Sequence, residues 1–184
     1  MFASTIATST TRRTPVLGLD DLASRSGEDL ELTYRAATPP RSMHAADGAL
    51  VGRMLAIRAM PELLAAPLRR WAASRSFVWE GKTFDAISDE RGSGHNRVFL
   101  PNVLGRQNLF PFATSFAASA IDGKPTLVLD YDLEANPGFI RRIHDEIREV
   151  APGVFLGPAM WKRARDKVLV LWFALDANAA ARPS

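Results

Sequence analysis

The stretch 121–176 constrains the fold more than any other part of this 184-residue chain. An Asp-Gly turn at 122–123 precedes an apolar run over 126–131, and two further apolar runs follow at 154–161 and 167–175. Short apolar runs bounded by Gly, Pro and Asp are typical of β-strands, and Asp-Gly is a strong signal for a hairpin turn. The stretch therefore predicts three strands of a small sheet, two of them joined as a final hairpin.

Residues 137–150, between these runs, have the spacing of an amphipathic helix. Asn136 is a favourable N-cap residue, and Pro137 suits the first helical position. Apolar residues then recur every three or four positions, opposite a charged face. They are Ile140, Ile143, Ile147 and Val150. We expect one helix here, packed against the sheet.

The rest of the chain contributes further strand patterns. From Phe110 to Ala120 the apolar and aromatic side chains occupy every second position, which predicts a half-buried strand. Shorter strands are expected at 49–57, 77–84 and 97–100, with loops at 89–96 and 101–108 and short helices at 19–26, at 29–36 and from Met60. Seven or eight short strands predict a mainly β fold, either a small antiparallel barrel or a strongly curled sheet, because closing a sheet removes its exposed edges.

The composition changes along the chain and predicts its domain organisation. Residues 1–17 are mostly small and polar, so we expect a disordered tail. Residues 18–46 are expected to form short helical segments and a proline-rich linker. The β-barrel domain is expected at 47–177, and a C-terminal tail at 178–184.

Charge and cysteine content exclude several classes of function. Lys and Arg total 23 against 20 Asp and Glu, and the acids are spread through both halves. We expect no nucleic-acid partner, because proteins that bind phosphates cluster their basic residues on one surface. The chain has no cysteine, which excludes disulfides and thiolate sites and is compatible with a cytoplasmic location. No apolar run is long enough for a membrane span. The oligomeric state is left open, with a homodimer among the options.

Four polar residues at the joints of the central stretch are candidates for acid–base catalysis: Asp130, Tyr131, Asp132 and His144. Alternation along a strand would put both carboxylates on one face, and a half-buried imidazole beside them could accept or donate a proton. The structural alternative is a strand-end pair that binds loop amides, with a histidine whose hydrogen bonds are satisfied internally. Both interpretations stay open at this stage.

Other polar motifs point away from metal and nucleophile chemistry. The sequence Gly92-Ser93-Gly94-His95 lacks the lysine of a phosphate-binding loop and the strand-to-helix context of a nucleophile elbow. We interpret it as a flexible loop at the mouth of the barrel. The three histidines have no metal-ligand spacing, so we expect no metal site and no cofactor.

The aromatic residues suggest a ligand site inside the barrel. Ten Phe and four Trp are many for a small barrel, and some of them are expected to line a cavity. Two cationic side chains in predicted strands could meet a carboxylate at the cavity mouth, although such side chains more often face solvent. The candidate ligand-binding residues are Arg53, Trp79, Lys82, Phe110, Phe112, Phe116, Trp161 and Trp172.

Five phrases of the sequence resemble an uncharacterised family of small bacterial proteins. They are WEGKTF at 79–84, FPF at 110–112, IDGKPTLVLDY at 121–131, REVAPGVFLG at 148–157 and VLWFALD at 170–176. That family is similar in outline to lipocalin-like, or calycin, barrels, and the resemblance covers 47–177. It implies a barrel that encloses one small apolar ligand, and it implies no particular activity.

Three hypotheses follow. The favoured one is a barrel that binds a hydrophobic small molecule with a carboxylate or phenolic end. The alternative is a cofactor-independent cyclase, isomerase or lyase that uses an Asp/Tyr/His acid–base pair in the same cavity. The third is an interaction module in which the helix at 137–150 or an open sheet face docks a partner.

Overall fold

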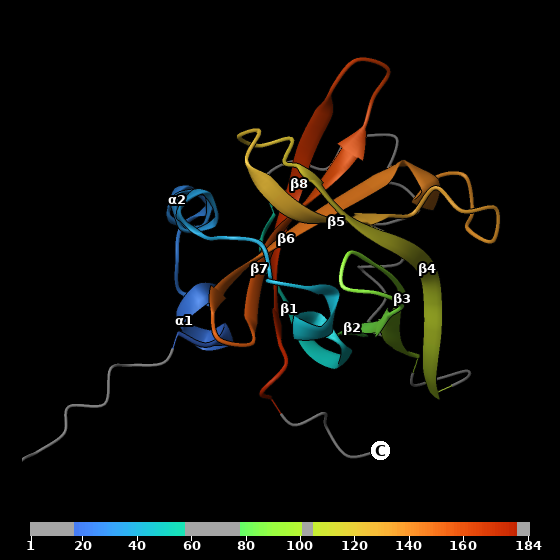
Figure 1. Ribbon diagram of the computed structural model, residues 1–184, viewed down its shortest axis with the longest axis horizontal. Coiled ribbons are helices and arrows are strands. Elements are labelled where there is room, and N and C mark those ends of the chain that lie inside the picture. Colours follow the sequence, from blue (N-terminus) through green and yellow to red (C-terminus); the bar gives the residue numbers. More distant parts are fainter. Residues whose placement is uncertain (1–16, 58–77, 101–104, 180–184) are drawn as a thin grey trace, which may run out of the picture.

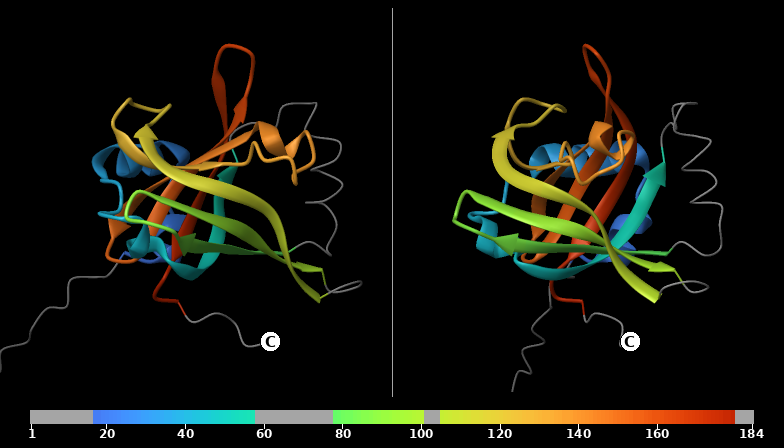
Figure 2. Two further views of the ribbon diagram at one scale, coloured as in Figure 1. Left: turned by 45° about the vertical axis from the view of Figure 1, so that its right-hand side comes forward. Right: turned by 90° about the vertical axis from the view of Figure 1, so that its right-hand side faces the viewer.

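Eight strands form a closed barrel in the computed structural model, which describes residues 17–57, 78–100 and 105–179 (Figure 1). Each strand is antiparallel to the next in sequence, and β8 pairs with β1 to close the ring. The strands are β1 (Gly48–Ile57), β2 (Val78–Ala86), β3 (Arg91–Leu100), β4 (Gly105–Ala118), β5 (Pro125–Asp130), β6 (Ile143–Ala151), β7 (Val154–Lys162) and β8 (Lys167–Asp176). The expected mainly β, antiparallel barrel is confirmed, and Figure 2 shows it from two further directions.

The inward side chains of every strand except β3 form one apolar core, the barrel interior. Its fully buried members come from alternate positions of the strands, as the period of two requires. They include Leu50, Phe84, Phe112, Leu127, Leu129, Ile147, Phe155, Phe173 and Leu175, with Tyr131 after the end of β5. Trp79, Phe110 and Phe116 pack against them. The predicted alternation of β4 is thereby confirmed.

Two short helices cover one side of the barrel from outside (Figure 1). They are α1 (Leu19–Ala23) and α2 (Gly27–Ala36), close to the predicted ranges. The Ser26 hydroxyl caps α2 by accepting a hydrogen bond from the Asp29 amide. Leu30 and Tyr34 of α2 then pack on outward residues of β7 and β8, including Trp172. Within the described ranges, neither helix has the length and apolar character that a membrane crossing requires.

A short 3-10 helix, η1 (Met43–Ala46), closes one end of the barrel. Met43 and Ala46 are fully buried members of the barrel interior. The Met43 amide donates to the Asp89 carbonyl in the β2–β3 turn, and Thr114 donates to the Met43 sulfur. The opposite end carries the β5–β6 connection and the β7–β8 turn.

The prediction of a helix over 137–150 is wrong. Only η2 (Ile140–Arg142) is helical, and residues 143–151 form β6, which pairs with β5 and β7. The reason lies in the spacing of Ile143 and Ile147, which are four residues apart. Four residues make about one helical turn, and an even separation also places two residues on the same face of a strand. Both face the barrel interior as alternate residues of a strand. The helix proposed as a docking surface therefore does not exist.

The predicted loop at 89–96 is also wrong beyond residue 90. Residues 91–100 form β3, which pairs with β2 and β4. Gly94 faces inward, and a Cβ atom there would lie 2.6 Å from the Phe112 ring. The small residues of this motif thus make room for an aromatic side chain inside a strand. Of the other predicted loop, 105–108 belongs to β4, while 101–104 and the helix expected from Met60 lie outside the described residues.

Candidate functional site

An ion pair crosses the barrel interior. Lys82 Nζ lies 3.0 Å from Asp145 Oδ2, and each residue is only 3% exposed. Lys82 is on β2 and Asp145 on β6, which are four strands apart in either direction around the ring. Charged side chains are rarely buried to this extent unless they are paired. The pair therefore joins opposite walls of the barrel.

A bulge in β2 places Lys82 in this position. Trp79 and Lys82 are three residues apart, so in a regular strand they would face opposite sides. The pairing of β2 with β3 shifts register between Trp79 and Gly81, and this extra residue brings both side chains inward. Gly81 has a φ of 137°, a conformation that L side chains rarely adopt.

Tyr131 and Asn96 complete the coordination of the lysine. Lys82 Nζ donates to Tyr131 Oη at 2.6 Å and to Asn96 Oδ1 at 2.9 Å, besides Asp145. Tyr131 Oη in turn donates to Asp145 Oδ2 at 3.0 Å. We call Lys82, Asn96, Tyr131 and Asp145 the inner polar cluster. Its three acceptors account for all three N–H groups of a lysine ammonium.

Asn96 is itself fully engaged. Its Nδ2 donates to Tyr131 Oη at 3.2 Å and to the Phe110 carbonyl at 3.3 Å. Its Oδ1 accepts from Lys82 and from Trp79 Nε1, the latter at 3.0 Å. Asn96 sits directly opposite Lys82 in the β2–β3 pairing, which explains why the two side chains meet.

Aromatic rings surround the lysine head group. The ring centroids lie between 5.1 and 5.5 Å from Lys82 Nζ, within the range of cation–π attraction. The rings belong to Trp79, Phe112, Tyr131 and Phe173. The cation is therefore held in a largely apolar environment by four π faces and three oxygen acceptors.

This burial shifts the pKa of two members of the cluster. Burial lowers the pKa of Lys82, and the neighbouring Asp145 carboxylate opposes that shift. Burial also raises the pKa of Tyr131 well above its usual value, and the charge of Asp145 adds to this. Tyr131 is consequently a neutral phenol at physiological pH, and its O–H remains a hydrogen-bond donor to Asp145.

One oxygen of the inner polar cluster has no donor among the residues that the structure describes. Asp145 Oδ2 accepts from both Lys82 and Tyr131. Asp145 Oδ1 is buried, and none of those residues places a donor within hydrogen-bond distance of it. A buried acceptor without a donor costs about 1–3 kcal/mol, and more when it is charged. The cluster can therefore still accept one hydrogen bond.

A second polar cluster lies on the other face of β6, beneath α2. Glu146 is fully buried there and has four polar partners. Its Oε2 accepts from Tyr34 Oη at 2.7 Å and Ser119 Oγ at 2.5 Å. Its Oε1 accepts from the Ala120 amide at 2.7 Å and lies 3.0 Å from His144 Nε2. We call Tyr34, Ser119, Thr126, His144 and Glu146, together with Arg148 and Asp122, the outer polar cluster.

Hydrogen bonds determine the direction in which the pKa of Glu146 is shifted. Burial by itself would raise the pKa of this carboxyl group, but the hydrogen bonds from His144, the Ala120 amide, Ser119 and Tyr34 lower it overall. Burial raises the pKa of Tyr34, and the Glu146 charge contributes. The carboxylate therefore stays ionised, and the phenol stays a donor.

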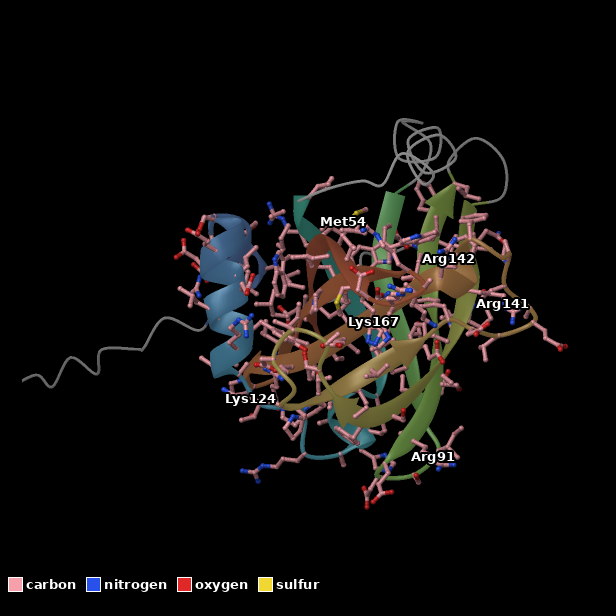
Figure 3. The ribbon with its side chains drawn as sticks, turned by 90° about the horizontal axis from the view of Figure 1, so that it is seen from above. Met54, Arg91, Lys124, Arg141, Arg142 and Lys167 are labelled. Carbon is pink, nitrogen blue, oxygen red and sulfur yellow. The ribbon has the colours of Figure 1, made fainter. Side chains whose placement is uncertain are left out.

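Arg148 binds the end of α2 to the β4–β5 turn. All its N–H groups are used: for Asp122 at 2.7 and 2.9 Å, and for the carbonyls of Tyr34, Lys124 and Pro125. The hydrogen bonds from Arg148 lower the pKa of Asp122 to about 2. Figure 3 shows Lys124 near α2, and Lys124 Nζ donates to the Arg35 carbonyl there.

The four predicted acid–base residues do not converge. Asp130 and Asp132 are exposed and pair with Lys162 and Arg141, at 2.7 and 2.6 Å. Tyr131 is in the barrel interior, whereas His144 is in the outer polar cluster. Alternation turns Asp130 outward and Tyr131 inward, and β6, being a strand, turns His144 outward and Asp145 inward. Asp130 and His144 are therefore opposite each other on the outer face of the β5–β6 pair, whereas Tyr131 lies on the inner face. The carboxylate that meets Tyr131 is thus Asp145.

The predicted ligand-binding residues divide into two groups. Five of them share the barrel interior: Trp79, Lys82, Phe110, Phe112 and Phe116. The other three lie elsewhere. Trp161 packs on Val170, with the Arg142 guanidinium 4.9 Å above its ring, Trp172 lies beneath α2, and Arg53 pairs with Asp20 on the surface. Figure 3 shows Arg142 beside Arg141, on the side of the barrel away from α1 and α2.

Two members of the inner polar cluster, Asn96 and Asp145, were not predicted from the sequence. Asn96 falls in the segment interpreted as a loop. Asp145 falls in the segment interpreted as a helix, where it belongs to the charged face. An available signal was the sequence Ile143-x-Asp145-x-Ile147, which in a strand places one carboxylate between two inward isoleucines.

Comparisons with known proteins assign no family to this chain. No protein-family model and no curated protein matches the sequence. Among solved structures, a crystal structure of a protein from Thermomonospora curvata is similar over 84% of this chain and 89% of that chain, at 17% sequence identity and a TM-score of 0.47. The chemistry available to this chain therefore has to be read from its own residues.

Proposed function

We propose that this protein binds one hydrophobic small molecule inside the barrel, with the polar end of that molecule against the inner polar cluster. The observation that carries the proposal is a buried ion pair in an aromatic interior, with one carboxylate oxygen that receives no donor from the described parts of the chain. Polar groups that converge among aromatic side chains are typical of small-molecule sites. Eight-stranded barrels are wide enough for packed side chains or for one small ligand.

Stability alone gives a poor account of the ion pair. Removing two charges from water costs several kcal/mol per ion, and replacing such a pair by apolar side chains of similar volume is often neutral or stabilising. A chain that needed only a stable barrel would do as well with two leucines at Lys82 and Asp145. Retention of the pair is explained if the polar end of a ligand uses it.

The sequence resemblance to calycin barrels supports the same function, since those barrels enclose one small apolar ligand. We place this function in the cytoplasm, in agreement with a chain that has no cysteine. The acid–base alternative would have to use Tyr131 with Asp145, because Asp130, Asp132 and His144 lie outside the barrel interior.

Native mass spectrometry of the full chain, purified from its own host, tests the proposal. We expect a bound small molecule on the wild-type protein and on Asp130→Asn, a substitution on the outer face of the barrel at a residue that pairs with Lys162 and accepts from the Asp132 amide. The double variant Lys82→Met/Asp145→Leu, prepared in the same way, should lose that mass while keeping its fold. A wild-type protein that carries no added mass and also binds none of 4-butylphenol, butylbenzene and 4-butylbenzoate would refute the proposal.

A further inference from the structure

We infer that the ligand presents a neutral hydroxyl group, phenolic or alcoholic, as a hydrogen-bond donor to Oδ1 of Asp145. This inference rests on the proposed function and names the class of molecule that the same site would take. It chooses between the two ligand ends that the sequence left open, a phenol and a carboxylate.

The donors of the inner polar cluster are all committed. Lys82 uses its three N–H groups for Asn96, Tyr131 and Asp145. Asn96 uses both N–H groups of its amide, and the Trp79 indole N–H is bound to Asn96. The Tyr131 hydroxyl donates to Asp145. A ligand carboxylate, which only accepts hydrogen bonds, would find no donor in this cluster without breaking an existing bond.

The acceptors leave one position open. Asp145 Oδ2 takes two hydrogen bonds, whereas Asp145 Oδ1 is buried and takes none from the described residues. An ionised carboxylate can accept at both oxygens. The group that fits this position is a donor, and a hydrogen bond from it would be charge-assisted and therefore strong.

The charge balance selects a neutral donor over a cationic one. Lys82 and Asp145 carry opposite charges, so the pair is neutral as it stands. A carboxylate would add a second negative charge next to Asp145, and an ammonium would add a second positive charge next to Lys82, both at low dielectric. A hydroxyl satisfies the open oxygen and leaves the balance unchanged. The surrounding rings of Trp79, Phe112 and Phe173 favour an apolar or aromatic body behind that hydroxyl.

Three probes with the same apolar body test the inference: 4-butylphenol, butylbenzene and 4-butylbenzoate. Their dissociation constants for the full chain are measured by isothermal titration calorimetry at neutral pH. A hydrogen bond to a charged group is worth roughly 1.5–3 kcal/mol, so we expect 4-butylphenol to bind about ten- to a hundredfold more tightly than butylbenzene. The benzoate should bind more weakly than the phenol.

The variant Asp145→Asn gives the sharpest readout. Lys82 and Tyr131 both need an acceptor, so the carbonyl oxygen of the substituted amide will face them and its N–H groups will take the place of Oδ1. The position of the unpaired acceptor Oδ1 is then occupied by an N–H donor, and the charge of Lys82 is no longer balanced by a carboxylate. The order of affinities should reverse, with 4-butylbenzoate binding more tightly than 4-butylphenol, and Asp130→Asn should keep the wild-type order.

A second variant guards against loss of folding. In Lys82→Met/Asp145→Leu both charges are replaced by apolar groups, and the phenol and butylbenzene should bind within about threefold of each other because the charge-assisted bond is gone. Benzoate as the tightest probe for the wild type would overturn the inference, and so would an undiminished phenol preference in the double variant. Failure of all three probes to bind the wild type would count against the proposed function instead.

Discussion

The two polar clusters of this barrel lie on opposite faces of the same strand, and they are built differently. The outer cluster, around Glu146 and Arg148, ties α2 and the β4–β5 turn to the sheet, and both side chains use all their hydrogen-bonding groups. The inner cluster spans the barrel from Lys82 to Asp145 and, within residues 17–57, 78–100 and 105–179, leaves one oxygen without a donor.

Under the proposed function, this difference separates a structural role of the outer cluster from a binding role of the inner cluster. A saturated network gains nothing from a further partner, and removing one member leaves several buried groups unsatisfied. A network with one open acceptor carries a cost that a ligand donor would relieve. Adjacent residues, Asp145 and Glu146, thus differ in their hydrogen bonding because alternation along β6 places them on opposite faces of the barrel wall.

The largest expected effects come from breaking the ion pairs. Lys82→Met leaves the Asp145 charge buried and unpaired and should lower the free energy of unfolding by about 3–5 kcal/mol. Adding Asp145→Leu removes the second charge and leaves the Tyr131 hydroxyl as the one buried donor without its acceptor, so the double variant should return to within about 2 kcal/mol of the wild type. Urea denaturation measures both. A double variant as unstable as the single one would show that the inner cluster is structural.

The outer cluster should not recover in the same way. Arg148→Met should also cost about 3–5 kcal/mol. Adding Asp122→Leu removes the partner charge, but the three backbone carbonyls that Arg148 satisfies lose its N–H groups. We expect the double variant to stay at least about 2 kcal/mol below the wild type in the same urea titration. Full recovery would erase the proposed contrast between the clusters.

Acid should act through the outer cluster. The pKa of Asp122 is lowered from its ordinary value of 3.8 to about 2, and the pKa of Glu146 is lowered from 4.5. A carboxyl group with a lowered pKa contributes stability that is complete above its unfolded pKa and is lost as the pH falls through its folded pKa. The urea concentration at the midpoint of unfolding should therefore decrease as the pH is lowered from about 5 to about 2. In Asp122→Asn the share of this loss that comes from Asp122, between pH 3.8 and about 2, should be absent, and the share from Glu146 should remain.

Two tyrosines allow a matched test of intermediate size. Tyr34→Phe and Tyr131→Phe each remove one buried hydroxyl and should each cost about 1–2 kcal/mol in urea denaturation. Tyr34→Phe should speed hydrogen exchange of the α2 amides and leave the binding of 4-butylphenol unchanged. Tyr131→Phe should leave α2 exchange unchanged and alter phenol binding, since it changes the donors to Asp145. Identical exchange and binding profiles for the two variants would mean that the clusters are not separable.

The smallest effects are expected at the exposed carboxylates. Asp130 and Asp132 form surface pairs with Lys162 and Arg141. Exposed pairs contribute about 0–1 kcal/mol, so Asp130→Asn and Asp132→Asn should each change the free energy of unfolding by less than about 1 kcal/mol. Thermal melting at two salt concentrations is sufficient to measure this. A large effect of either variant on probe binding would place a polar site outside the barrel interior.

Most of the fold could be predicted from the sequence, because the strand signals are local. The hairpins at 118–125 and 162–167 follow from turn residues between apolar runs, and the alternation in β4 is unambiguous. The segment 137–150 was wrongly predicted as a helix, because Ile143 and Ile147 fit both periods and Asp145 suggests a solvent-exposed face. The segment forms a strand because it pairs with both β5 and β7. These are tertiary contacts, which the local sequence pattern does not contain.

The site was predicted in part for the same reason. Tyr131 and the aromatic residues of β4 lie on or beside strands whose inward faces could be predicted, whereas Lys82 was named as a ligand-binding candidate although regular alternation would turn it away from Trp79. Asp145 and Asn96 lie on β6 and β3, which were assigned otherwise, so their convergence on Lys82 could not be seen. The bulge at Gly81 adds a further obstacle, because it puts Trp79 and Lys82 on one side against the regular alternation.

The seam between β1 and β8 affects the order of assembly. α1 lies over this seam and touches both strands, and Asp20 of α1 pairs with Arg53 of β1. All the other pairings in the barrel join strands that are consecutive in the sequence. The β1–β8 pairing joins residues more than a hundred positions apart, so we expect it to form slowly. Among the described elements the two helices are made first, yet the surface that receives α1 exists only once the final strand has arrived. We therefore expect α1, which is synthesised before the strands, to be among the last described elements to dock onto the barrel.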